Sequence, residues 1–177
     1  MIQWRKVSKN NLDAQFLFDV SELLTQSKYT WYVTEAYRTI ERSNRLWDEY
    51  KHGVVLRDAN NTPLRDADGN IRRGKKGARA AIGGLSAHNY GRAIDVVLDG
   101  SDDPGLQMNW NTKLPGWLWL KQAIWKHPRL HSGWSFGDWP HIEQYKWKDY
   151  VPWRKTYEDN LYAVQHPTLF IGIGLPA

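Results

Sequence analysis

The stretch SAHNYGRAIDVVL, residues 86–98, decides the fold, because it places a histidine and an aspartate beside the clearest core strand of the chain. Side chains on a strand alternate between its two faces. The positions that share the apolar face are Ile94, Val96 and Leu98. Asp95 then points to the opposite face, toward the surface or a cleft. Gly91 permits a sharp turn before the strand, so we expect His88 to lie over the face that carries Asp95.

The rest of the chain alternates helical and strand-like segments. Apolar residues at helical spacing predict a helix over 12–25, and the aromatic, β-branched segment that follows predicts a strand ending near Thr34. Thr39 is a suitable N-cap for a second helix beginning at Ile40. Further elements are expected as a helix over 117–127 stopped by Pro128, two strand pieces within 132–144 and a helix over 154–164. Together they predict an α+β fold in which helices pack on a small antiparallel sheet.

A single domain accounts for most of the chain, since 177 residues would crowd two independent domains. We expect one domain over 1–146 and a C-terminal extension over 147–177 that packs on it. The glycine- and arginine-rich segment 53–83 is expected to be an insertion formed by a hairpin and a basic loop. No internal repeat is visible, and DGSDD at 99–103 is interpreted as a solvated loop.

The composition limits both the chemistry and the partners. The chain has no cysteine, so disulfides, thiolate catalysis and cysteine-based zinc sites are excluded, and His, Asp and Glu are the strong metal ligands that remain. The net charge of +5 favours anionic partners, of which nucleic acid and the bacterial cell wall are both candidates. No apolar run approaches the roughly 20 residues needed to span a bilayer. The N-terminus lacks the apolar core of a signal peptide, so we expect synthesis in the cytoplasm.

A second histidine-bearing segment, GDWPHIE at 137–143, supplies a third candidate metal ligand in His141. Together with His88 and Asp95 it matches a catalytic zinc site, in which three protein ligands leave the fourth position to water. Asp138 lies three residues before His141, and a turn at the intervening Trp-Pro can hang its carboxylate beside the metal. Zinc lowers the pKa of its bound water to about 7, and a nearby carboxylate can accept the proton during attack on a carbonyl. The spacing therefore predicts a hydrolase.

Three segments carry a family resemblance. SAHNYGRAID resembles the S-x-H-x-x-G-x-A-x-D motif of the zinc metallopeptidases that share the Hedgehog/D-Ala-D-Ala peptidase fold, and DWPHIE resembles their second motif. VTEAYRTIERSNRLW, residues 33–47, is similar to the segment that supplies the substrate-binding arginine of that family and the helix after it. The resemblance covers most of residues 8–145 in the expected order. The segment 53–83 is longer than in compact family members, and the tail after Tyr145 has no counterpart in them.

The resemblance implies a role for each matching residue. The zinc ligands that it implies are His88, Asp95 and His141. Asp138 is implied to be the general base and later the proton donor, Arg38 to hold the substrate carboxylate or the oxyanion, and Ser86 to hydrogen-bond near the site. The D-Ala-D-Ala dipeptidases and carboxypeptidases of the family usually carry Glu as the base, whereas Asp is typical of the L-alanyl-D-glutamate endopeptidases, which include bacteriophage endolysins.

The sequence thus predicts a phage-type endolysin that uses zinc (Zn2+) to hydrolyse the L-alanyl-D-glutamate bond of bacterial peptidoglycan. We expect a monomer that binds no nucleic acid, inserts into no membrane and acts on the cell wall after release from the host cytoplasm. Two alternatives stay open. One is a D,D-carboxypeptidase or dipeptidase on the same scaffold, and the other is a non-catalytic cell-wall-binding or phage tail module.

Plainer interpretations of single residues also stay open. Asp138 is a common turn-forming residue type, Arg38 can form an ordinary salt bridge at a strand end, and Ser86 can cap backbone groups. The remaining histidines are expected at the surface or in packing positions, and they are His52, His127, His131 and His166. DADGN at 66–70 begins like a calcium loop but lacks the glutamate required at the twelfth position, so a turn is expected there.

Overall fold

The structure is a computed structural model that describes residues 1–4, 7–78, 80–99 and 108–165. The chain forms two compact units, which are Met1–Arg38 with Ala87–Pro152, and Thr39–Ser86 with Trp153–Ala177. The predicted boundary after residue 146 and the packing of the extension stay predictions. Residues 100–103 of the predicted solvated loop, and 166–177 of the predicted extension, lie outside the described residues. None of the helices in the described ranges is long and apolar enough to cross a membrane.

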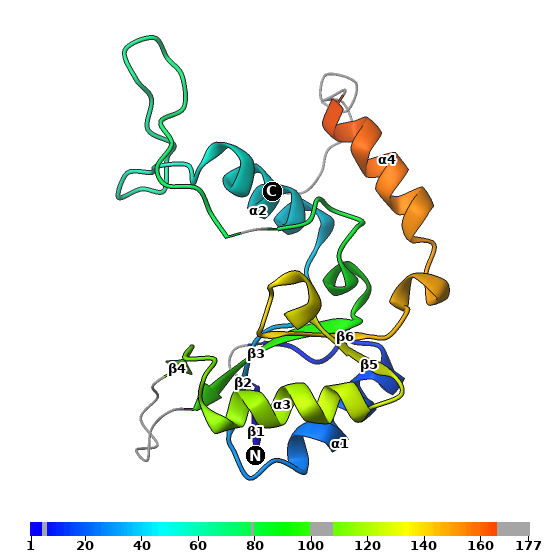
Figure 1. The fold of residues 1–177 in the computed structure, drawn as a ribbon. Coiled ribbons are helices and arrows are strands. Elements are labelled where there is room, and N and C mark those ends of the chain that lie inside the picture. The colour runs from blue at the N-terminus through cyan, green and yellow to red at the C-terminus, as the bar shows by residue number, and fades with distance from the viewer. Residues whose placement is uncertain (5–6, 79, 100–107, 166–177) are drawn as a thin grey trace. The chain divides into compact units, whose positions relative to one another are not determined.

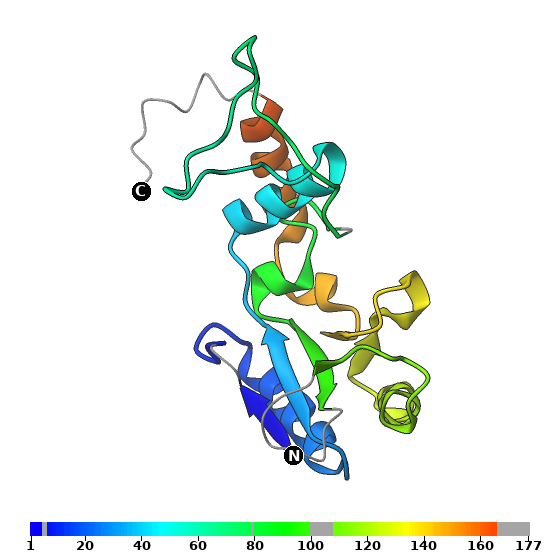
Figure 2. The ribbon, with the colours of Figure 1, turned by 90° about the vertical axis from the view of Figure 1, so that its left-hand side faces the viewer.

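The first unit is built on a sheet that has six strands within the described residues (Figure 1). They are β1 (Ile2–Trp4), β2 (Trp31–Glu35), β3 (Ala93–Asp99), β4 (Met108–Asn109), β5 (Leu130–Ser132) and β6 (His141–Gln144). The strand order is β1-β2-β3-β6-β5, with β4 paired to β3. Figure 2 shows β2 and β3 side by side. The pairs are antiparallel as predicted, except that β1 at the edge lies parallel to β2.

Helices complete the described part of the first unit. They are α1 (Ala14–Thr25), α3 (Pro115–Lys126) and the short 3-10 helices η1 (Ala87–Tyr90), η2 (Gly133–Phe136) and η3 (Trp147–Tyr150). α1 begins two residues after its predicted start because Asp13 caps it, accepting a hydrogen bond of 2.9 Å from the amide of Phe16. α3 begins at Pro115, whose missing N–H costs nothing in the first turn. The predicted α+β class is therefore confirmed.

One hydrophobic core joins α1 and α3 to the sheet. Its fully buried side chains include Trp31 of β2 and Trp117 of α3, whose rings meet edge to face with centroids 5.4 Å apart. Ile94 and Val96 supply the predicted apolar face of β3 and are fully buried. Burial of an aliphatic side chain of this size contributes about 1.5–3 kcal/mol. The core thus fixes the strand that carries Asp95.

The pairing of β3 with β6 fixes the polar side of the sheet. Asp95 lies opposite His141, and Ala93 lies opposite Glu143. Paired residues of neighbouring strands project to the same face. Because side chains alternate along β6, His141 and Glu143 share the face that carries Asp95, while Ile142 between them is buried in the core.

The turn predicted at Gly91 is present and requires glycine. Gly91 has a φ of +65°, which side chains disfavour. A Cβ atom there would lie only 2.0 Å from the carbonyl oxygen of Asn11. The carbonyl of Gly91 also accepts a hydrogen bond of 2.9 Å from the amide of Asp13. This tight packing joins η1, which carries His88, to the start of β3.

Gly91→Ala should destabilise the first unit more than the matched change Gly137→Ala. Gly137 also has a positive φ, +82°, but a Cβ atom there meets nothing within 4 Å. We expect Gly137→Ala to cost about 1–2 kcal/mol from backbone strain alone. Gly91→Ala should cost a further ~1–3 kcal/mol, because the neighbouring backbone must move. Urea unfolding of both variants measures the difference, and equal losses would contradict the tight turn.

The second unit contains α2 (Ile40–His52) and α4 (Trp153–Gln165). α2 begins where predicted, since Oγ1 of Thr39 accepts a hydrogen bond of 3.2 Å from the amide of Arg42. The two helices are joined by an amide pair, in which Nδ2 of Asn44 donates to Oδ1 of Asn160 over 2.7 Å. The helix predicted over 154–164 is the observed α4.

An eight-residue internal repeat lies in the second unit, so the expectation of no repeat is wrong. LRDANNTP at 56–63 and LRDADGNI at 64–71 share their first four residues. In each copy, Oδ1 of the first aspartate accepts hydrogen bonds of 2.8–3.0 Å from the amides two and four residues later. In each copy, Nη1 of the arginine donates to the carbonyl four residues later, over 2.7 Å from Arg57 and 2.5 Å from Arg65.

Each copy forms one short antiparallel ribbon. The segments that precede and follow the repeat pair with each other and form a third ribbon. The bridges that define the ribbons are Arg57–Pro63, Arg65–Ile71 and Val55–Arg73. Backbone hydrogen bonds of 2.8–3.0 Å close a ring, from Leu64 to Leu56, from Arg72 to Leu64 and from Leu56 to Arg72. The antiparallel pairing predicted within 53–83 is therefore present as three short bridges in a pseudo-threefold arrangement, and the basic loop stays a prediction. Figure 1 shows two of its loops in cyan-green.

Candidate metal centre

Three side chains from distant parts of the first unit converge on one point. His88 comes from η1, Asp95 from the middle of β3 and His141 from the first position of β6. Nε2 of His88 and Nδ1 of His141 lie 3.3 Å and 3.1 Å from the same oxygen, Oδ1 of Asp95. One possible ligand atom from each residue lies within 4.8 Å of the others. The structure thus brings together the three residues predicted as metal ligands.

Backbone hydrogen bonds orient His88 in this cluster. Nδ1 of His88 lies 2.6 Å from the carbonyl oxygen of Ala36. Since a carbonyl only accepts, Nδ1 carries a proton, and in the neutral ring the lone pair is on Nε2. Nε2 is the atom that faces Asp95. The amide of Arg38 also donates to the carbonyl of His88 over 3.1 Å, which ties η1 to the segment after β2.

The carboxylate of Glu143 orients the ring of His141. Nε2 of His141 lies 3.1 Å from Oε2 of Glu143, and Nδ1 of the same ring faces Asp95. Burial is the largest single effect and raises the pKa of Glu143, but the hydrogen bonds to His141 and His131 and the charges of both rings together hold the pKa below its usual range. Sequence reasoning missed Glu143. Its signal was the spacing of two residues from His141 in a strand, which places both side chains on one face.

The charges inside the cluster favour the ionised form of Asp95, which is the form that binds a metal. Burial alone would raise its pKa, but the charge of His88 and the hydrogen bonds from both imidazoles hold the pKa well below its usual range. Burial is the largest single effect and lowers the pKa of His141, but the hydrogen bonds to Asp95 and Glu143 and the charges of these two carboxylates together raise the pKa to about 10. The cluster therefore presents an ionised carboxylate between two imidazole rings, and this arrangement attracts a metal cation.

The donor set fits zinc. Two imidazole nitrogens and one carboxylate oxygen are ligand types of catalytic zinc sites, which keep a fourth position open. Calcium and magnesium prefer sets of oxygen ligands. Each histidine also has a partner on its other ring nitrogen, as metal-binding histidines usually do. His88, Asp95 and His141 can therefore hold a divalent transition metal ion.

Asp138, the predicted general base, lies in the turn before β6. Its amide donates to the carbonyl of Gly133 over 2.9 Å, and its carbonyl accepts from the amide of His141 over 3.2 Å. Glycine is required at position 133, because a Cβ atom would lie 2.1 Å from the carbonyl oxygen of Asp138 and 2.8 Å from Cβ of His141. Backbone groups of Asp138 hold this turn, so the turn does not depend on the carboxylate.

The carboxyl group of Asp138 is a stronger base than a free aspartate. Burial raises its pKa, and the charge of Asp95 raises it further, while the positive groups around the cluster oppose both effects. The result is a pKa above the usual range. A base with a raised pKa is better matched to proton transfer near neutral pH.

Arg38 lies at the edge of the cluster, but its guanidinium is already paired. Nε and Nη2 donate to the two carboxylate oxygens of Glu35 over 3.0 Å and 2.6 Å. Nη2 also lies 3.8 Å from Oδ2 of Asp95. An irregularity after Val33 in the β2–β3 pairing places Glu35 opposite Asp95. The plainer interpretation of Arg38 as a salt-bridge residue is therefore observed, and its binding of a substrate carboxylate stays a prediction.

Other predicted residues lie outside the cluster or have unexpected contacts. Ser86 belongs to the second unit, so its hydrogen bond near the site stays a prediction. His52 pairs with Asp48 over 2.8 Å and is exposed, as expected. His131 was also expected in an ordinary surface or packing position, but its Nδ1 lies 3.2 Å from Oε1 of Glu143.

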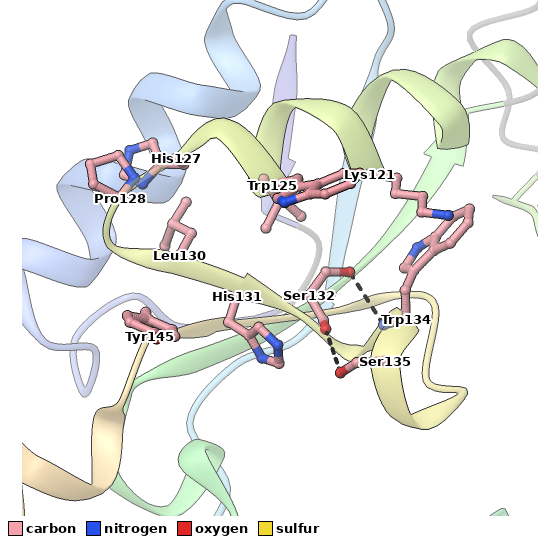
Figure 3. Close-up of a pocket in the computed structure, with 11 residues that line it drawn as sticks. Lys121, Trp125, His127, Pro128, Leu130, His131, Ser132, Trp134, Ser135 and Tyr145 are labelled. Atoms are coloured by element: carbon pink, nitrogen blue, oxygen red, sulfur yellow. Dashed lines mark hydrogen bonds between the residues drawn. The ribbon is translucent and has the colours of Figure 1, made fainter.

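A pocket of about 610 Å³ lies between α3, β5 and η2 (Figure 3). Trp125 reaches it from α3, His131 from β5 and Trp134 from η2. The three candidate ligands are not among its lining residues. Trp125 is 85% exposed, although tryptophan is highly buried on average. His131 connects the pocket to the metal cluster, because it lines the pocket and contacts Glu143.

No family model and no curated protein matches the chain. Among solved structures, the chain is similar to the L-Ala D-Glu endopeptidase ChiX of Serratia marcescens. The two chains are 15% identical, the likeness covers 80% of this chain and 86% of that one, and the TM-score is 0.49. Because the identity and the TM-score are this low, the functional inference rests on the side chains of the cluster.

We expect the protein to bind one zinc ion with an affinity that depends on both histidines of the cluster. His88→Ala and His141→Ala should each weaken binding by more than the roughly 10–100-fold typical of changes outside the ligand shell. His52→Ala is the matched control, because His52 is exposed and belongs to the second unit. Competition with a chromogenic chelator measures the three affinities. Wild-type affinity in His88→Ala would place the zinc elsewhere.

Proposed function

We propose that the chain is a zinc-dependent peptidase that cuts peptidoglycan stem peptides between L-alanine and D-glutamate. The proposal is carried by the convergence of His88, Asp95 and His141, in which two imidazole nitrogens face one carboxylate oxygen. Asp138 adds a base whose pKa is raised by burial. The resemblance of SAHNYGRAID and DWPHIE to the two motifs of zinc metallopeptidases supports the reaction class.

Asp138 carries the proton in this proposal. Zinc held by the three ligands would polarise the scissile carbonyl and lower the pKa of a water molecule. Asp138 accepts a proton from the attacking water and then donates it to the departing amine, so one carboxyl group serves as base and as acid. The raised pKa of Asp138 favours the second role, because the protonated carboxyl group persists closer to neutral pH.

Arg38 orients the substrate in this proposal. A guanidinium binds a carboxylate through parallel hydrogen bonds, and peptidoglycan stem peptides carry several carboxylates. Glu35 holds two nitrogens of Arg38 over 3.0 Å and 2.6 Å. A substrate carboxylate therefore has to displace Glu35 or approach the guanidinium from its other edge. Nη2 of Arg38 lies 3.8 Å from Oδ2 of Asp95, so the guanidinium lies beside a proposed metal ligand.

The type of base supports the choice of bond and the biological role. In the family that the chain resembles, dipeptidases and carboxypeptidases usually carry Glu at the position of Asp138, whereas Asp is typical of the endopeptidases. We infer from the same resemblance a phage-type endolysin, made in the host cytoplasm and acting on the cell wall after release as a monomer. The net charge of +5 favours its approach to an anionic wall.

Digestion of purified sacculi tests the reaction. The wild-type protein should release new D-glutamate amino termini, and a chelator should abolish the release until zinc is restored. Asp138→Asn should retain zinc but lose about 10²–10⁴-fold in rate, because the amide cannot accept the proton. Asp68→Asn is the matched control, since Asp68 lies in an exposed turn of the second unit.

Mass spectrometry of the digest separates the alternatives. Loss of terminal D-alanine alone would assign a D,D-carboxypeptidase or dipeptidase in place of the endopeptidase. Binding to sacculi without release of any amine would assign a non-catalytic wall-binding module. Full activity of Asp138→Asn would remove Asp138 from the mechanism while leaving the reaction itself intact.

A further inference from the structure

Glu143 uses both carboxylate oxygens to hold two imidazoles. Oε2 lies 3.1 Å from Nε2 of His141, and Oε1 lies 3.2 Å from Nδ1 of His131. The side chain of Glu143 is 17% exposed, so these contacts form largely out of water. Hydrogen bonds to an ionised acceptor are stronger than those between neutral groups. The three side chains form a continuous line from the pocket wall to Asp95.

The sheet itself produces this line. Glu143 lies directly opposite His131 in the β5–β6 pairing, and it follows His141 by two positions in β6. Paired and alternate residues of strands share one face. Leu130 pairs with Gln144 on one side and Ser132 with Ile142 on the other, so backbone pairing fixes the register on both sides of the His131–Glu143 pair.

We propose that Glu143 is a positioning residue that keeps the proton of His141 on Nε2 and thereby presents Nδ1 to the metal, and that His131 holds Glu143 in place. The proposal rests on the metal site of the proposed function. An imidazole without such a partner can exchange its proton between the two nitrogens and rotate, and both changes weaken it as a ligand.

The two metal-binding histidines differ in what sets their tautomer. His88 is set by the backbone carbonyl of Ala36, which no substitution of a side chain removes. His141 depends on Glu143 and, through it, on His131. His131 is 39% exposed and lines the pocket shown in Figure 3. The metal centre can thus be altered from the pocket through one hydrogen-bonded line.

Zinc affinity, measured by chelator competition, tests the proposal without any assay of peptidase activity. Glu143→Ala should weaken zinc binding by about 10–100-fold. Glu143→Gln keeps an acceptor but removes the charge, so its loss should be smaller than that of Glu143→Ala. His131→Gln should weaken binding less than either. His127→Gln is the matched control, because His127 lines the same pocket while its Nδ1 accepts from the backbone amide of Arg129 over 3.2 Å.

A purely structural role for Glu143 predicts a different pattern. If Glu143 only ties β5 to β6, Glu143→Ala should lower the melting temperature and leave zinc affinity unchanged, and that result would overturn the proposal. NMR of the zinc-loaded protein gives a second readout, since the Nε2 proton of His141 should be protected from exchange with water in the wild type and lose protection in Glu143→Ala. Unaltered protection would also overturn it.

The outcomes for the proposal and for the proposed function are distinguishable. A wild-type protein that takes up no zinc overturns both. A wild-type protein that binds zinc, loses affinity in Glu143→Ala, and releases no amine from sacculi supports the role of Glu143 and overturns the peptidase. A peptidase whose zinc affinity is unchanged in Glu143→Ala overturns the role of Glu143 alone.

Discussion

Oδ1 of Asp95 is shared by Nε2 of His88 and Nδ1 of His141, at 3.3 Å and 3.1 Å. A buried carboxylate without partners costs several kcal/mol, so the surrounding unit must keep both rings in place. The turn at Gly91 returns His88 to Asp95, and the β3–β6 pairing sets His141 opposite it. The core beneath β3 makes this arrangement rigid. The carbonyl of Ala36 and the carboxylate of Glu143 contact the other ring nitrogens, and they determine which nitrogen of His88 and of His141 faces Asp95.

Local patterns predicted the part of the site that is close in sequence. Alternation along 93–99 gave the core strand and the facing of Asp95, and the conformational freedom of Gly91 gave the turn that returns His88. The N-cap preference of Thr39 placed the start of α2 correctly. These features depend on backbone sterics and on hydrogen bonds within a few residues, which a single sequence contains.

Contacts set by strand register could not be predicted in the same way. His141 meets Asp95, and Glu143 meets His131, because neighbouring strands pair with a particular offset, and one residue of slip would move either side chain to the opposite face. β1 and β4 have three and two residues, too few to show a period. The repeat at 56–71 was missed because only the first four of its eight positions are identical, and the equivalence of the rest lies in turn hydrogen bonds.

Anomalous X-ray diffraction from crystals soaked in zinc, recorded on both sides of the zinc edge, tests the metal site most directly. One peak is predicted at roughly 2.0–2.2 Å from Nε2 of His88, a carboxylate oxygen of Asp95 and Nδ1 of His141, with Nε2 of His141 still bonded to Glu143. Zinc bound through other atoms, or no peak between these three at saturating zinc, would contradict the account.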